Sequence, residues 1–208
     1  QDGDTVTSLV GQDIVLDTRN SKFSPTDGFV ARASTDIAGL GGDAKYVRAK
    51  LASAVHYKII KDWVLNFSGE VNHIQDFGEE LSINDLFFLG GDNLRGFAVA
   101  GVGPRDSTTD DALGGRTLLT GTAELHYPLG LPKELGISGA VFTDIGTLLN
   151  PIAEGAQLLD EATPRVATGV GLRWRSPFGP IRIDASLPIL KESFDQEELI
   201  HFNFGTRF

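Results

Sequence analysis

The sequence predicts an all-β fold, a transmembrane antiparallel β-barrel in which residues 1–208 form one unit. Three observations predict it. Apolar and polar residues alternate with a period of two at strand length, and no segment shows a convincing helical period. Short, turn-rich connections alternate with longer polar ones. The terminal segment, 199–208, places Ile200, Phe202, Phe204 and Phe208 on one face, and such a face suits lipid better than water.

About nine strands are expected along the chain. The clearest show strict alternation, as in the segment that begins at Trp63 and the one that begins at Val166. Four others alternate more weakly but have a suitable length. The expected strands cover about residues 8–17, 28–38, 44–58, 63–72, 119–127, 136–146, 166–175, 181–187 and 199–208.

Two kinds of connection join these strands. Those at about 18–27, 59–62, 128–135 and 176–180 are fairly short and rich in turn-forming residues. The others begin near Gly39, Asp76, Leu148 and Leu190, and the longest covers about residues 76–116. A loop of this length in a compact domain indicates a function. Short turns at one end of the strands and long loops at the other are typical of outer-membrane barrels.

The polar face of the strands carries charges in mid-strand. These residues are Arg32, Asp36, Arg48, Lys50, Glu70, Glu124, Asp144, Arg173, Arg182 and Asp184. They would face the lumen of a barrel or the water around a soluble β-sandwich, so periodicity alone leaves both folds open. Aromatic residues near strand ends favour the barrel, because membrane interfaces carry such girdles. They are Trp63, Tyr127, Trp174 and Phe208.

Composition excludes several classes of function. The chain has no run of the roughly 18–20 apolar residues that a transmembrane helix requires. Its net charge of −10 argues against nucleic acid as a partner, and the absence of cysteine removes disulfides and thiolate metal sites. No side chains resemble a nucleophile or an acid–base pair, so we expect no enzyme activity and no cofactor. The chain begins at Gln1 without a leader, and we expect an internal piece of a longer protein.

Candidate metal ligands are weak. The four histidines lack metal-ligand spacing, and core or lumen positions suit them better. They are His56, His73, His126 and His201. Asp106, Asp110 and Asp111 could bind calcium, but a solvated acidic loop is the favoured interpretation. We therefore expect no metal site.

A motif rich in glycine lies in the long loop. It reads Phe88-Leu89-Gly90-Gly91-Asp92-Asn93-Leu94-Arg95-Gly96-Phe97, and Gly103-Pro104-Arg105-Asp106 follows it. Gly90 and Gly91 allow a sharp reversal of the chain. Arg95 then presents a permanently charged fork of five donors, which suits bidentate pairing with a carboxylate. Asp144 is the expected partner because its strand parity places it on the lumen face. On these residues alone, a solvated arginine beside a simple turn is an alternative.

The chain resembles the BamA family of outer-membrane protein assembly factors. The loop motif is similar to the family's Gly-Gly…Arg-Gly-Phe/Tyr signature. Other similar elements are Phe142-Thr143-Asp144-Ile145-Gly146 for its F-x-D-x-G strand, Trp174-Arg175-Ser176-Pro177-Phe178-Gly179-Pro180 for its W-x-S-P-x-G-P turn, and Asp17-Thr18-Arg19 with Pro25-Thr26-Asp27-Gly28 for a strand–turn element. The aromatic C-terminal strand resembles its assembly signal. The resemblance covers essentially the whole chain.

The resemblance implies a fold and a site. Family members have sixteen barrel strands, so about nine strands would be the C-terminal half of the barrel, without the preceding strands and the periplasmic POTRA domains. The long loop would enter the lumen, where an acidic residue of the F-x-D-x-G strand holds its arginine. The implied site residues are the loop motif Gly90, Gly91, Leu94, Arg95, Gly96 and Phe97, and the lumen partners Asp144, Phe142 and Gly146.

The resemblance also implies a function, the folding and insertion of other β-barrel proteins into the bacterial outer membrane without nucleotide hydrolysis. Implied partners are outer-membrane lipids, unfolded β-barrel clients and outer-membrane lipoproteins of an assembly complex. Clients would pair at an openable seam formed in part by the terminal strand, with Phe202, Phe204, Gly205 and Phe208. Gly205, mid-way along this strand, would weaken its pairing. A related two-partner secretion or translocation pore and a passive outer-membrane barrel are alternatives.

Overall fold

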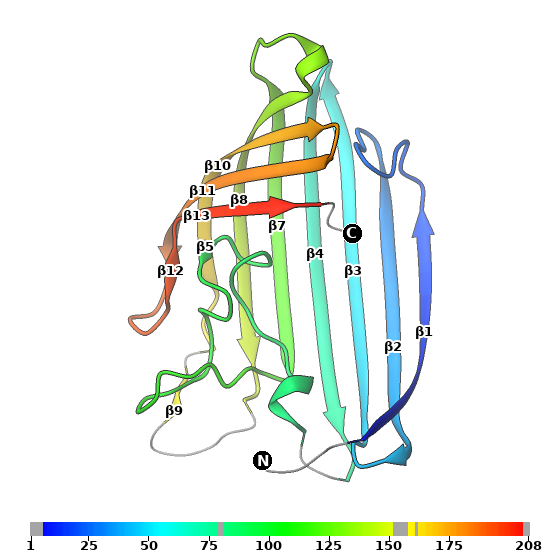
Figure 1. The fold of residues 1–208 in the computed structure, drawn as a ribbon, viewed down its shortest axis with the longest axis vertical. Helices are drawn as coiled ribbons and strands as arrows, with labels where there is room; N and C mark the ends of the chain where they lie inside the picture. The colour runs from blue at the N-terminus through cyan, green and yellow to red at the C-terminus, as the bar shows by residue number, and fades with distance from the viewer. Residues whose placement is uncertain (1–5, 79–80, 152–157, 161, 206–208) are drawn as a thin grey trace.

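The strands form one large antiparallel sheet in the computed structural model, which describes residues 6–78, 81–151, 158–160 and 162–205. Nine strands pair in the order β1-β2-β3-β4-β7-β8-β10-β11-β13 (Figure 1). Their bounds are β1 Thr7–Asp17, β2 Gly28–Gly42, β3 Tyr46–Ile60, β4 Trp63–Asp76, β7 Thr117–Pro128, β8 Ile137–Leu149, β10 Arg165–Ser176, β11 Gly179–Leu190 and β13 Ile200–Phe204. The expected all-β fold is confirmed, and each of the nine expected strands has a counterpart.

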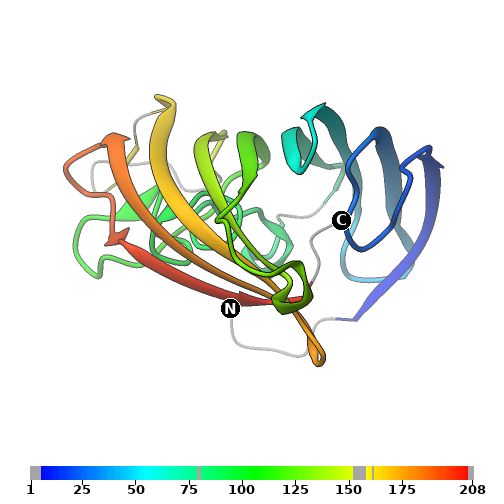
Figure 2. The same ribbon diagram turned by 90° about the horizontal axis from the view of Figure 1, so that it is seen from above.

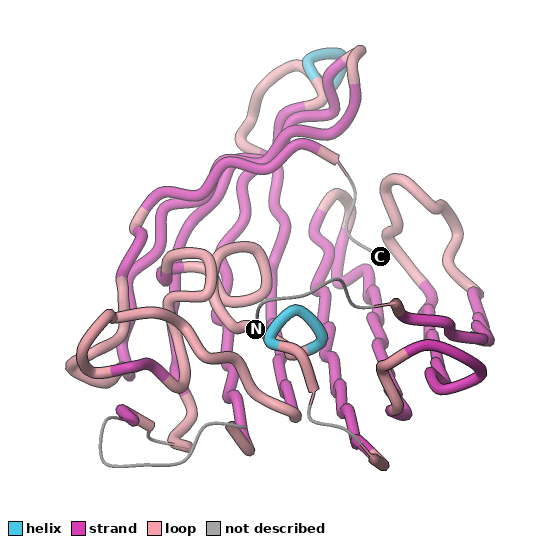
Figure 3. Tube along the Cα trace, turned by 60° about the horizontal axis from the view of Figure 1, so that its bottom comes forward, coloured by secondary structure: helices cyan, strands magenta, loops and turns pink. Residues whose placement is uncertain are grey.

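The sheet is strongly curved and open, so it forms part of a barrel wall (Figure 2). Within the described residues, β1 lies at one edge of the sheet and β13 lies at the other. β10, β11 and β13 run at a steep angle to β1–β4 (Figure 1), as the accumulated twist of a barrel sheet requires. The long loop, defined here as residues 77–116, lies on the concave side (Figure 3).

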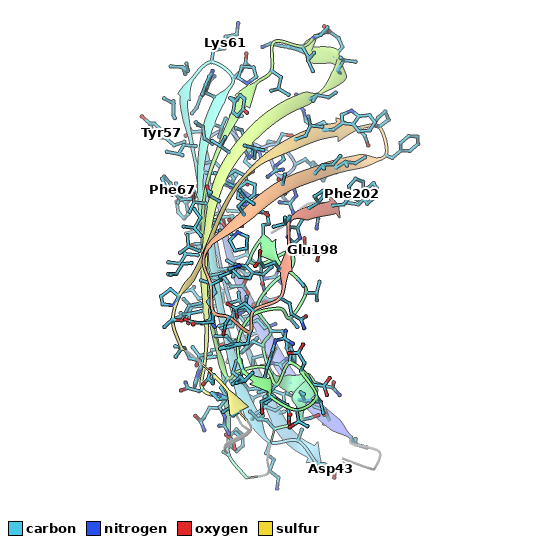
Figure 4. The ribbon with its side chains drawn as sticks, turned by 90° about the vertical axis from the view of Figure 1, so that its left-hand side faces the viewer. Asp43, Tyr57, Lys61, Phe67, Glu198 and Phe202 are labelled. Carbon is cyan, nitrogen blue, oxygen red and sulfur yellow. The ribbon has the colours of Figure 1, made fainter. Side chains whose placement is uncertain are left out.

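The convex face of the sheet is apolar. Tyr57 and Phe67 project from this side (Figure 4), and their side chains are 62% and 52% exposed. Other exposed apolar residues of these strands are Leu51, Val55, Val71, Val141, Ile145, Val170, Leu172, Ile183 and Leu187. An apolar exterior around a polar interior is the pattern of a barrel in lipid. The sandwich alternative is wrong, because no second sheet of the described chain packs on this apolar face.

The connections contain only short elements within the described residues. The long loop holds η1 (Ile83–Asp85), β5 (Gly96–Phe97) and β6 (Arg105–Asp106). The connection between β7 and β8 holds η2 (Lys133–Leu135), and later connections hold β9 (Leu158–Leu159) and β12 (Glu197–Glu198). No helix in the described part of the chain is long and apolar enough to cross a membrane.

The connection between β2 and β3 differs from the expectation of a long loop beginning near Gly39. β2 continues to Gly42 and β3 begins at Tyr46, so only residues 43–45 join them. Gly39, Gly41 and Gly42 interrupt the apolar alternation, which is why the sequence reads as a loop there. The register shifts in this stretch, and pairing resumes at Gly42, whose register partner is Thr7. The β1–β2 connection, 18–27, is longer.

The apolar core lies between the concave face and the long loop. The loop contributes buried side chains, including those of Leu89, Leu94, Phe97 and Val102, and the sheet contributes others, including Ile74, Leu118 and Leu148. Burial of several large apolar side chains stabilises the docked loop, at about 1.5–3 kcal/mol for each fully buried one. The long loop is therefore an integral part of the core, and this fixes the position of the arginine motif.

Candidate functional site

The loop motif is a closed turn that begins with a chain reversal. Gly90 has a φ of 124°, and a Cβ atom at this position would lie 2.1 Å from the carbonyl oxygen of Ala98. The Asn93 side chain closes the turn, accepting a bond from the Gly90 N–H at 2.8 Å and donating to the Phe88 carbonyl at 2.9 Å. The Gly91 N–H donates to the carbonyl of Phe97 at 2.8 Å. These bonds leave Leu94 and Arg95 at the tip.

Arg95 meets Asp144 in the concave interior. Its Nε donates to Asp144 Oδ2 and its Nη2 to Asp144 Oδ1, both at 2.7 Å. The Arg95 backbone N–H donates to Oδ2 as well, at 3.3 Å. The two side chains are only 6% and 2% exposed, and the guanidinium carbon lies 3.3 Å from the ring centroid of Phe142. This bidentate geometry is the strong form of a charge-assisted pair, and a guanidinium is attracted to an aromatic face.

Arg95 belongs to a larger buried group, here called the arginine cluster: Arg95, Arg173, Glu124, Asp144 and Asp184. Arg95 Nη1 donates to Glu124 at 2.7 Å and lies 3.6 Å from Asp184. Arg173 bonds both of those carboxylates, Glu124 at 2.8 Å and Asp184 at 2.5 Å. Two cations and three anions therefore share one site. Such networks are stable only when nearly every polar group is paired.

The ionic state of the loop arginine follows from this arrangement. Burial acts to lower the pKa of Arg95, but the hydrogen bonds and charge of Asp144, with the charge of Glu124, outweigh it. The net effect is a pKa above the ordinary value for arginine. Arg95 therefore carries its positive charge across the physiological range of pH.

The sequence predicted the polar face for Glu124, Arg173 and Asp184. It did not predict that they belong to the site of Arg95. Their meeting depends on strand register. Glu124 of β7 is the register partner of Phe142, two residues from Asp144 on β8. Gly171 of β10 pairs with Asp184 of β11. Strand parity is visible in the sequence, whereas the register that brings four strands together is not.

The remaining motif residues fix the loop against the sheet. Leu94 and Phe97 are fully buried. The Gly96 N–H donates to Nε2 of His201 at 2.9 Å, so the terminal strand contacts the motif directly. Gly146 lies against the loop, because a Cβ atom there would be 2.9 Å from Leu89 Cδ1. The histidine had no signal in the sequence beyond its place on the inner face of the strand.

The terminal strand is described in part. β13 covers Ile200–Phe204, and Gly205 follows it with a φ of 114°. The position of Gly205 within the full terminal segment stays a prediction. Phe202 and Phe204 are 56% and 69% exposed, consistent with a lipid-facing side. Phe208 lies outside the described residues.

The second half of the loop motif stabilises the loop internally. Arg105 is buried, and its guanidinium donates to the carbonyls of Asp110 and Ala100 at 2.6 and 2.7 Å. The Asp106 carboxylate accepts bonds from the Thr108 and Thr109 N–H groups, which lowers the pKa of Asp106. Within the described residues, no group of three or more His, Asp or Glu side chains is arranged to hold a metal ion.

Comparisons with known proteins agree with this geometry. The model of the Omp85 superfamily domain matches residues 1–208. Outer membrane protein assembly factor BamA of Neorickettsia risticii is 32% identical over 208 residues, which are 99% of this chain and 28% of that protein. Sorting and assembly machinery component 50 homolog of Homo sapiens is 29% identical over 145 residues, covering 68% of this chain and 30% of the relative.

A solved structure supports the fold. The crystal structure of BamA from Haemophilus ducreyi lacking POTRA domains 1-3 superposes with a TM-score of 0.82 at 24% identity, over 93% of this chain and 41% of that one. The chain thus spans well under half the length of the relatives that it matches. With its open nine-stranded wall and its buried loop arginine, the chain belongs to the Omp85 superfamily and forms part of a BamA-like barrel.

Proposed function

We propose that residues 1–208 form the C-terminal half of the barrel of an outer-membrane assembly factor, which folds and inserts other β-barrel proteins. The relative in Neorickettsia risticii carries the name of such a factor. The proposed partners are unfolded β-barrel clients, the surrounding outer-membrane lipids and the lipoproteins of an assembly complex. The chain acts by strand pairing rather than by nucleotide hydrolysis or other enzyme chemistry.

The membrane assignment follows the relatives. Two bacterial relatives named BamA are 32% and 26% identical to this chain, whereas the human sorting and assembly machinery homolog is 29% identical over a shorter stretch. We propose an outer membrane as the location whichever group of relatives is taken as the guide. We assign the chain to the bacterial outer membrane because the first of these bacterial relatives matches 99% of it.

The physical task of such a factor is to pair backbone groups in lipid. An inserting strand carries N–H and C=O groups that no water can satisfy, and each unsatisfied group costs several kcal/mol. An exposed sheet edge satisfies these groups by adding the strand to itself. The protein must therefore present an edge whose own pairing is weak enough to exchange.

The orientation of β13 is the observation that carries this proposal, because it directs a row of backbone groups away from β11. The Gly205 N–H donates to Pro180 at 2.9 Å and the Ser186 N–H donates to Leu199 at 2.8 Å, so odd-numbered residues face β11. In an antiparallel sheet the intervening residues direct their backbone groups to the other side. The residues whose backbone N–H and C=O groups face away from β11 are Ile200, Phe202 and Phe204. Within the described chain, no strand pairs with this side of β13.

β13 is also weakly held. It pairs with β11 over five residues, from Ile200 to Phe204, whereas β10 and β11 are twelve residues long and pair over nearly their whole length. Gly205, directly after the strand, has a φ of 114°, and a glycine adds no side chain to the packing of a strand. A short edge strand exchanges partners at lower cost than a long one, and this supports a seam at β13.

Locking the seam tests the proposal. The chain has no native cysteine, so in the full-length protein Phe202→Cys can be paired with a cysteine in the first barrel strand. We expect oxidation to stop client assembly and reduction to restore it, because strand exchange requires the seam to open. Assembly yield of a barrel client in membrane vesicles is the measurement.

A second disulfide controls for oxidation and rigidity. Val170→Cys with Ala185→Cys joins register partners of β10 and β11, which stay paired throughout the proposed cycle. Both side chains lie on the convex face of the sheet. This tether should leave assembly unchanged. Undiminished assembly with the seam tether formed would overturn the proposed mechanism. A passive barrel predicts no client assembly in either the oxidised or the reduced protein.

A further inference from the structure

A second buried arginine pair lies outside the arginine cluster, where the last long connection meets the sheet. Arg165, the first residue of β10, donates from Nε to Asp195 Oδ2 at 2.9 Å and from Nη2 to Asp195 Oδ1 at 3.2 Å. The two side chains are 2% and 0% exposed. Arg165 also lies among the largest fully buried side chains of the described chain. The sequence motifs did not mark either residue.

Neighbouring groups complete this pair. Arg165 Nη1 donates to the carbonyl and the hydroxyl of Thr163, at 2.7 and 2.9 Å. The Glu192 N–H donates to Asp195 at 2.7 Å, and the Thr163 hydroxyl donates to the Glu192 carboxylate at 2.7 Å. The Phe194 ring centroid lies 5.6 Å from the guanidinium carbon. The segment 192–195 is thus folded around one buried charge pair.

The chain after Asp195 connects this pair to the long loop. The Gln196 N–H donates to Gly101, and the Ala98 N–H donates to Gln196, both at 2.9 Å. β12 then pairs with β5, which contains Gly96 and Phe97 of the loop motif. Figure 4 shows Glu198 of β12 close to the ribbon of the long loop. β13 begins two residues after Glu198, at Ile200.

We propose that Arg165 and Asp195 form a second anchor, which positions the start of β13 and couples it to the long loop; this inference rests on the proposed function. Within the described chain, β13 pairs with β11 alone. The segment that leads into β13 helps to set its position, and that segment is fixed at Asp195. A bidentate ion pair that is fully buried constrains orientation as well as distance. Arg165 and Asp195 are positioning residues for strand exchange.

Hydrogen exchange in the full-length protein in lipid vesicles tests the anchor independently of assembly. Asp195→Asn keeps the size of the side chain and removes its charge, so the bidentate ion pair with Arg165 is lost. We expect peptides that cover 192–204 to exchange faster by about tenfold or more, because their opening no longer breaks a charge pair. Peptides around Arg95 should keep their protection, since the arginine cluster is intact. Unchanged exchange over 192–204 would overturn the anchor.

A milder variant and a matched control keep the test decisive. Arg165→Lys keeps the charge but loses the bidentate guanidinium. The hydrogen-exchange rate of peptides covering 192–204 should therefore lie between the rates in the native protein and in Arg165→Gln. A role in filling space alone would make Lys and Gln equivalent, which would contradict the proposal. Arg116→Gln removes another ion pair at the same end of the strands, that of Arg116 with Asp76. This variant should leave the hydrogen exchange of peptides covering 192–204 unchanged.

The functional arm separates this inference from the proposed function. We expect Asp195→Asn to reduce client cross-linking to β13 about tenfold, with the amount of folded barrel unchanged, as the edge no longer holds one position. Faster exchange with undiminished cross-linking would overturn the positioning role while leaving the seam itself supported. Failure of the seam tether to stop assembly would overturn the proposed function, whatever the exchange result.

Discussion

Arg95→Ala is expected to release the long loop from the barrel interior and to abolish most assembly activity. The substitution leaves Glu124, Asp144 and Asp184 buried with Arg173 as their only guanidinium in the arginine cluster. Removing one partner of a buried ion pair costs about 3–5 kcal/mol. At about 1.4 kcal/mol for each tenfold change, the docking equilibrium of the loop falls roughly 100- to 4,000-fold. Limited proteolysis of residues 77–116 and client assembly in vesicles measure the two effects.

Two variants make this result specific. Arg95→Lys keeps the charge without the bidentate fork, so loop protection should be intermediate. Lys133→Ala removes the exposed pair with Asp62, whose side chains are 68% and 41% exposed, and should change neither readout. Native protease protection in Arg95→Ala would show that the arginine is a solvated loop residue after all.

Gly90→Ala is expected to prevent closure of the loop motif, with an effect close to that of Arg95→Ala. The new Cβ atom would lie 2.1 Å from the Ala98 oxygen, at a φ that side chains rarely adopt. The strained backbone alone costs about 1–3 kcal/mol, and the clash adds to it because the neighbouring atom belongs to the backbone. The turn must open, which withdraws Arg95 from Asp144. Protease sensitivity of the loop and client assembly report the outcome.

Gly179→Ala is the matched control for this variant. Gly179 has the same φ of 124°, and a Cβ atom there meets nothing within 4 Å. It therefore reports the backbone strain without the clash, at a turn remote from the loop motif. Loop protection should be native in Gly179→Ala. Equal loss of protection in both variants would assign the effect to general destabilisation rather than to the motif.

The strands were predictable because each must present one face to lipid and the other to the interior. Period-two alternation records that requirement residue by residue. The same parity identified the inward side of Asp144, and the structure brings Arg95 to it. The glycine-rich end of β2 misled the prediction, since its glycines break the apolar alternation while the strand continues through a shift of register to Gly42, which still pairs with Thr7. Backbone pairing leaves no direct trace in side-chain pattern.

The arginine cluster and the second anchor required the three-dimensional register. Glu124 lies 60 residues from Asp184 in the sequence, and Arg165 lies 30 residues from Asp195. For each of these residues, the sequence predicts only that its charge lies on the inner face of a strand or in a loop. Which charges meet depends on strand tilt, on strand ends and on the folding of the connections, and no local pattern encodes these.

The central claim is that client strands pair with the edge of β13 that faces away from β11, and photo-cross-linking from that edge tests it most directly. A photoreactive phenylalanine analogue replaces Phe202 in the full-length protein, and Phe67 of β4 serves as the matched control. Both native residues are aromatic and outward-facing, at 56% and 52% exposure, but Phe67 lies mid-sheet. The account predicts adducts with unfolded barrel clients from position 202 and only background from position 67. Equal yields at the two positions, or no client adduct from β13 during active assembly, would contradict it.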